Sequence, residues 1–185
     1  MNKFSFAREL QSIIDNKSLV ELYLKDTADF EVVYILGSAN ACLVFAVVGS
    51  AGDFRGLTVT PWSNITLFKT DTLYLKAFEG KINQKLIWNE IEKSFFLVKS
   101  YDLLEWLKQL NQLNKIVAIT DQSLNDVAGI ITAYDDNLLV LDEYTSEYHT
   151  KLAHAYLKIN DVQKLTIDAP WLKTIEQIAF NKKMS

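Results

Sequence analysis

The chain matches itself at a spacing of 97 residues, and this internal repeat limits the folds open to it more than any other feature does. Residues 71–79 (DTLYLKAFE) share Asp, Leu, Lys and Glu with residues 168–176 (DAPWLKTIE) at corresponding positions. The spacing slips to 96 where residues 43–45 lie over residues 139–141. Loops accept insertions that helices and strands do not, so a one-residue slip is typical of a diverged duplication. The competing interpretation is a chance match between two ordinary patterns of strands and helices.

Each half of the chain predicts a helix followed by five short strands. Apolar residues recur at helical spacing near the start, where Phe6, Leu10 and Ile13 share a face, and again over residues 101–113. Asp, Asn, Gly, Ser and Pro cluster between the apolar segments, as they do in turns between strands. We expect strands at residues 19–24, 30–36, 41–48, 54–60 and 65–69, and then at residues 115–120, 127–133, 138–143, 148–159 and 162–167.

Five short antiparallel strands in about 50 residues cannot bury both faces as a flat sheet. Each set is therefore expected to curl into a small barrel whose edges are closed or capped. The predicted fold class is mainly β with helices (α+β), built from two tandem five-stranded small β-barrels. Residues 1–80 would form the first unit, residues 81–99 a connecting helix, and residues 100–185 the second unit with its C-terminal helix.

The composition excludes several classes of protein. A chain of 185 residues with 49% apolar residues and one cysteine is neither disordered nor collagen-like nor held by a disulfide framework. A formal charge of -4 disfavours a generic polyanion binder, so we expect no DNA partner. Cys42 stands in an apolar run and predicts a buried thiol in a reducing compartment.

The N-terminal residues predict an amphipathic helix rather than a signal peptide. The longest apolar runs are far shorter than the roughly 20 residues of a spanning helix. We therefore expect a cytoplasmic protein without a membrane partner.

Two segments carry a family resemblance. Residues 129–138 (GIITAYDDNL) run from a glycine-containing strand into an Asp and Asn loop, and residues 54–59 (FRGLTV) contain Arg-Gly. Together with a helix and five strands per half, these segments resemble the Sm-like fold, a variety of SH3-like barrel. The resemblance implies that exposed fourth and fifth strands join subunits into rings. It also implies single-stranded RNA binding, which many members of that family show.

RNA bound in that manner would stack a base on an aromatic or Arg plane, with a loop Asn to read it and a cation near the phosphate. The residues that could supply these contacts are Asn40, Arg55 and Gly56 in the first unit and Tyr134, Asn137 and Lys151 in the second. The competing interpretation is that the Asn residues form turns and that the Gly relieves a bend in a strand. The segment from Asp121 to Glu147 has seven acids and no Lys or Arg, which would repel phosphates.

Trp62, in the turn Pro-Trp-Ser before the last strand of the first unit, is a candidate contact with a protein partner, because aromatic residues concentrate at interfaces. A position beneath the mouth of the barrel is the alternative for this side chain.

The sequence contains no phosphate loop, nucleophile elbow or metal signature. His149 and His154 are five residues apart on an expected strand, so they would point to opposite faces and could not share a metal. We therefore expect no catalytic residues, no metal and no cofactor. The expected function is binding or assembly, with self-association through barrel-edge strands into a dimer or ring. RNA binding in the Sm-like manner is the second hypothesis, and an enzyme of unrecognised type is the third.

Overall fold

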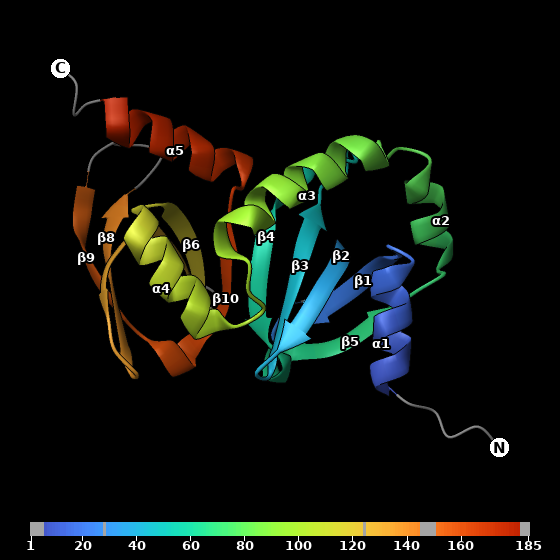
Figure 1. Ribbon diagram of the computed structural model, residues 1–185, viewed down its shortest axis with the longest axis horizontal. Coiled ribbons are helices and arrows are strands. Elements are labelled where there is room, and N and C mark those ends of the chain that lie inside the picture. The colour runs from blue at the N-terminus through green and yellow to red at the C-terminus, as the bar shows by residue number, and fades with distance from the viewer. Residues whose placement is uncertain (1–5, 28, 124, 145–150, 182–185) are drawn as a thin grey trace.

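The computed structural model describes residues 6–27, 29–123, 125–144 and 151–181, and Figure 1 shows their arrangement. The first half contains α1 (Phe6–Asp15), β1 (Leu19–Leu24), β2 (Phe30–Ala39), β3 (Cys42–Val48), β4 (Phe54–Pro61), the 3-10 turn η1 (Trp62–Asn64), β5 (Ile65–Lys69) and α2 (Leu73–Glu79). The helix α3 (Gln84–Val98) follows. The second half contains α4 (Leu103–Leu113), β6 (Ile116–Asp121), β7 (Asp126–Tyr134), β8 (Leu138–Tyr144), β9 (Lys151–Lys158), the 3-10 turn η2 (Ile159–Asp161), β10 (Val162–Ile167) and α5 (Pro170–Asn181).

The two halves have the same plan. In each, a helix, four strands, a 3-10 turn, a fifth strand and a further helix follow in the same order, and most elements recur about 97 residues later. The predicted helix and five strands of each half are confirmed by this order. Helix α3 lies within the expected connecting segment, while the unit boundaries at residues 80 and 100 stay a prediction.

All ten strands belong to one antiparallel sheet with the order β5-β1-β2-β3-β4-β10-β6-β7-β8-β9. Neither half is a closed barrel in the described residues, because neither pairs its own fourth strand with its own fifth, and the arrangement as two small barrels stays a prediction. Instead β4 pairs with β10, so the fourth strand of the first half joins the fifth strand of the second. The sheet is therefore open. Among the described strands, β5 and β9 each have only one partner.

Helices pack on the sheet along its length (Figure 1). Helix α1 places Leu10 and Ile13 in a cluster with the strands of the first half. Helix α5 places Leu172 and Ile175 against apolar residues of β6 and β7. The largest cluster contains the fully buried Trp106 of α4 and combines residues of both halves. The two halves therefore share one core, whose burial of apolar area stabilises their junction.

Within the described ranges, every helix falls short of the length and apolarity that a membrane crossing requires.

Candidate interface at the two free edges of the sheet

The two halves meet where β4, the fourth strand of the first half, pairs with β10, the fifth strand of the second half. Leu57, Thr58 and Val59 pair with Ile167, Thr166 and Leu165 of β10. The hydroxyl groups of Thr58 and Thr166 lie 2.9 Å apart and share a hydrogen bond across the junction. All three residues of β4 are buried. The strand pairing and the side chains together exclude water here.

Further hydrogen bonds close the same junction. The backbone carbonyl oxygen of Gln163 accepts from the Thr60 hydroxyl at 2.6 Å and from the Asn64 side-chain amide at 3.0 Å. The Lys164 ammonium donates to a Glu31 carboxylate oxygen at 2.8 Å, which links β10 with β2. The internal junction is therefore rich in polar contacts.

Gly56 permits the close approach of β10. Its φ is +132°, and a Cβ atom there would lie 2.9 Å from both the Ile167 carbonyl oxygen and the Thr166 methyl carbon. The sequence predicts either a strand bend or an RNA contact at Gly56. The structure places it against β10, so the residue serves the junction between the halves.

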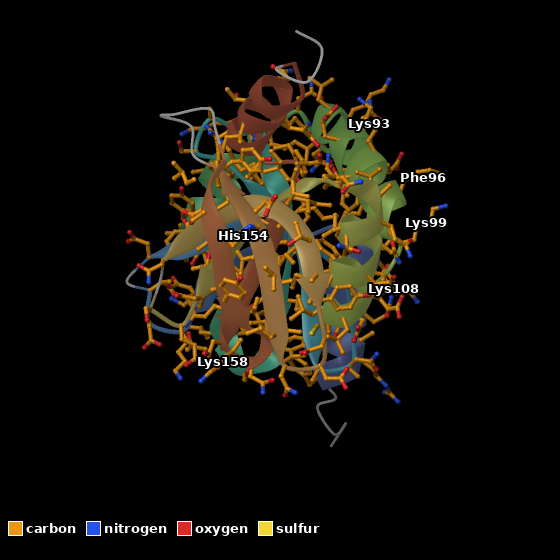
Figure 2. All side chains as sticks on the ribbon, turned by 90° about the vertical axis from the view of Figure 1, so that its left-hand side faces the viewer. Lys93, Phe96, Lys99, Lys108, His154 and Lys158 are labelled. Carbon is orange, nitrogen blue, oxygen red and sulfur yellow. The ribbon has the colours of Figure 1, made fainter. Side chains whose placement is uncertain are left out.

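The strands β5 and β9 form the two free edges of the sheet, with β9 at the left of Figure 1 and β5 beneath β1 towards the lower right. Figure 2 shows β9 on the side that faces the viewer, with His154 and Lys158 on it. Large apolar side chains stand exposed on both strands: Leu67 is 46% exposed on β5, and Tyr156 is 67% exposed on β9. Soluble proteins seldom leave long apolar edges open, because these invite pairing with another chain.

Trp62 lies beside the β5 edge and is half-buried. Its indole N–H donates to the Ser38 hydroxyl at 2.7 Å, and its ring contacts Phe6 edge to face at a centroid distance of 5.5 Å. The ring centroid of Phe68 lies 5.9 Å from that of Phe6. These rings line an open groove of about 350 Å³ together with residues 65–67. Phe6 and Phe68 thus lie beside Trp62, the predicted contact with a partner. The sequence did not show this grouping, because Phe6 and Phe68 are far apart in the chain.

The residues proposed for RNA do not assemble in the first half. Asn40 lies in the β2–β3 turn with a φ of 48°, whereas Arg55 follows the first residue of β4. Because Val48 pairs with Phe54, the strand β3 separates the two sites by roughly 20 Å. The Arg55 guanidinium donates to Asp53 at 2.8 Å. The predicted Asn and Arg set is therefore not brought together.

The second half shows the same separation. Tyr134 and Asn137 lie at one end of β8, but Lys151 pairs with Tyr144 at its other end. The Lys151 side chain lies outside the described part of the chain. The Asn137 backbone N–H donates to the Asp135 carboxylate at 2.7 Å, and such bonds lower the pKa of this exposed carboxyl group. This is the turn-forming role that the competing interpretation gave to the Asp and Asn loop.

The acidic segment also serves its own turns. The Asp121 carboxylate accepts from the backbone N–H groups of Ser123 and Asn125. His154 contacts Asp142 at 2.9 Å between ring nitrogen and carboxylate oxygen, while His149 lies outside the described residues. In the part of the chain that the structure describes, no three His, Cys, Asp or Glu residues gather as metal ligands.

Searches of protein-family models, of curated protein sequences and of solved structures each found no match to the chain.

Proposed function

We propose that this is an assembly protein, in which β9 of one copy pairs with β5 of the next copy as β4 pairs with β10 inside one chain. Each half would then be a curled five-stranded unit of Sm-like type, and the chain would carry two such units side by side. The support is the strand order 5-1-2-3-4, which recurs in both halves as β5-β1-β2-β3-β4 and β10-β6-β7-β8-β9. The free edges are therefore the repeat counterparts of the two strands that already pair.

The observation that carries the proposal is the difference in burial between counterparts. Val59 and Leu165 face each other at the internal junction and are completely buried. Their counterparts 97 residues away are Tyr156, which is 67% exposed, and Phe68, which is half-buried. The sequence retains apolar residues at these positions although the described residues leave Tyr156 mostly exposed and cover Phe68 only in part. A second copy would cover both.

The internal register predicts the register between copies. Moving each pair by 97 residues places Phe68 opposite Tyr156, Lys69 opposite Ala155 and Thr70 opposite His154. Such an interface is heterologous, because it joins two different strands of identical chains.

Disulfide trapping tests this register. Facing residues of an antiparallel pair have Cα atoms about 4.5 to 5.5 Å apart, within the range that a disulfide bridges. We expect that a mixture of Lys69→Cys and Ala155→Cys proteins, concentrated together and then oxidised, gives a covalent dimer on a non-reducing gel. The double variant should give a ladder of covalent oligomers. The native Cys42 should stay out of the reaction, because burial raises the pKa of its thiol.

Each single variant oxidised alone is the control, because a heterologous interface never brings two copies of the same strand together. A covalent dimer of Lys69→Cys alone would show a symmetric β5–β5 contact and contradict the proposed pairing. The absence of any covalent dimer in the mixture, with a mass of 21.1 kDa by light scattering at high concentration, would overturn self-association altogether.

RNA binding stays the second candidate. Phe96 on α3 is 68% exposed, and the Lys99 ammonium lies 3.7 Å from the centre of its ring. Figure 2 shows Lys93 and Lys108 on the same side of the molecule. An exposed aromatic ring with a cation over it is a surface on which a base can stack. This surface is separate from the residues that the sequence analysis proposed.

A further inference from the structure

We infer that Tyr156 of one copy inserts its ring into the aromatic groove beside β5 of the next copy, and that this contact supplies most of the affinity between copies. The aromatic groove is lined by Phe6, Trp62, Ile65 and Phe68, with Thr66 and Leu67 at its margin. The inference rests on the proposed pairing of β9 with β5. It adds the side-chain contact that would hold the two copies together.

The internal junction already contains the same arrangement with smaller side chains. Val59 is the counterpart of Tyr156, and it belongs to a buried cluster with Leu103, Ile159, Val162 and Leu165. All five side chains are less than a tenth exposed. Inside one chain, therefore, the fourth strand contributes Val59 to the same buried cluster as residues of the first helix, the 3-10 turn and the fifth strand of the other half, and Leu165 lies directly opposite it.

The counterparts of those four residues are four of the six residues that line the aromatic groove. Phe6 stands where Leu103 stands, Trp62 where Ile159 stands, Ile65 where Val162 stands and Phe68 where Leu165 stands, each 97 residues earlier. The groove residues are partly exposed: Phe6 is 45% exposed, and the other three are half-buried. The site built around Val59 is thus present a second time without its occupant.

The occupant that fits is on the same chain, on the other free edge. Replacing Val59 by Tyr156 enlarges the inserted side chain, and three of the four counterpart residues are aromatic in the groove but aliphatic at the internal junction. A tyrosine buries about 150 to 250 Å² and can meet Trp and Phe rings edge to face. Aromatic anchors seated in pockets dominate the affinity of protein interfaces. A second copy of this chain is therefore the partner we assign to the groove.

The test measures self-association of Tyr156→Ala, Tyr156→Phe and Tyr134→Ala proteins by sedimentation, with folding checked by circular dichroism. We expect Tyr156→Ala to raise the dissociation constant at least about 30-fold, which is about 2 kcal/mol. Tyr156→Phe keeps the ring and should stay within about fivefold of the unchanged chain. Tyr134 is also an exposed tyrosine, but it lies on β7 away from both edges, so Tyr134→Ala should leave the constant unchanged.

Fluorescence gives a second measurement that needs no substitution of Tyr156. Covering Trp62 on assembly should shift the emission of the protein to shorter wavelength as concentration rises, and Trp62→Phe should abolish that shift. If Tyr156→Ala associates as tightly as the unchanged chain while the Lys69→Cys and Ala155→Cys mixture still gives its covalent dimer, the groove contact is refuted and the edge pairing survives. If that mixture gives no covalent dimer and the unchanged chain is monomeric, both proposals fail together.

Discussion

At the scale of single residues, Gly56 shows how one position can determine whether two strands meet. Its φ of +132° is a conformation that essentially only glycine adopts, and the space for a side chain is occupied by the Ile167 carbonyl oxygen and the Thr166 methyl group of β10. We expect Gly56→Ala to lower the free energy of unfolding by about 2 to 3 kcal/mol. Urea denaturation would measure this as a lower midpoint.

Gly80→Ala is the matched control. Gly80 follows α2 with a φ of -65°, and nothing lies within 4 Å of a Cβ atom built there. Alanine should therefore raise the free energy of unfolding by up to about 1 kcal/mol. Equal losses in the two variants would contradict the steric role of Gly56.

In this chain, residue types predicted turns correctly. They did not predict which residues lie close enough together to form one binding site. The Asn and Asp residues near Asn40 and Asp135 suggested turns, and both lie in turns. Asn40 precedes the expected strand at residues 41–48 and Arg55 follows it, so the strand bounds alone put the two residues at opposite ends of that strand. Residue type indicates what a position can bind, but not at which end of a strand the position lies.

At the scale of elements, α4 shows why the helical pattern was readable. The side chain of Asp102, just before the helix, accepts a hydrogen bond from the Glu105 backbone N–H at 3.0 Å, and Leu103, Leu107 and Leu110 then recur on one buried face. Caps and periodicity are properties of neighbouring residues. The leucine periodicity therefore predicts this helix over residues 101–113, which begins two residues before the helix that Asp102 caps in the structure.

The same helix offers a matched pair of substitutions. Leu107 is fully buried in the shared core, whereas Leu104 is 46% exposed on the same helix. We expect Leu107→Ala to cost about 2 to 5 kcal/mol of unfolding free energy, through lost burial and a cavity. Leu104→Ala should change it by no more than about 0.5 kcal/mol. Thermal or urea unfolding of both variants would measure this difference in unfolding free energy. Similar losses of unfolding free energy in the two variants would contradict the placement of Leu107 in the core.

Strand neighbours were harder to predict than strands. Alternation of apolar and polar residues indicates that a segment is a strand with one buried face, but it does not name the strand that lies beside it. The pairing of β4 with β10 joins residues more than 100 positions apart, such as Val59 and Leu165. The sequence therefore predicted two separate sets of five strands, and it did not predict that the two sets join edge to edge in one sheet.

At the scale of the whole molecule, the described sheet ends in two different free edges, and in the proposed assembly β9 of one copy would pair with β5 of the next. A heterologous interface of this kind closes into a ring when its rotation allows and otherwise grows into a filament. Unpaired edges are a liability in solution, so we expect closure. Light scattering should show a mass that is a fixed multiple of 21.1 kDa and stays constant above a threshold concentration. A mass that rises without limit would contradict closure.

The proposed contact between copies would differ in character from the internal one. Hydrogen bonds of Thr58, Thr60 and the Gln163 carbonyl make the internal contact partly polar, whereas Tyr156 and Phe68 would make the other contact aromatic. In a closed assembly, polar and aromatic seams would alternate around the circumference. Only the aromatic seams can come apart on dilution, because the polar ones are tethered by the polypeptide itself. Disassembly would therefore always release whole chains in which the two halves stay joined. Any molecule bound across the polar seam inside one chain would remain bound.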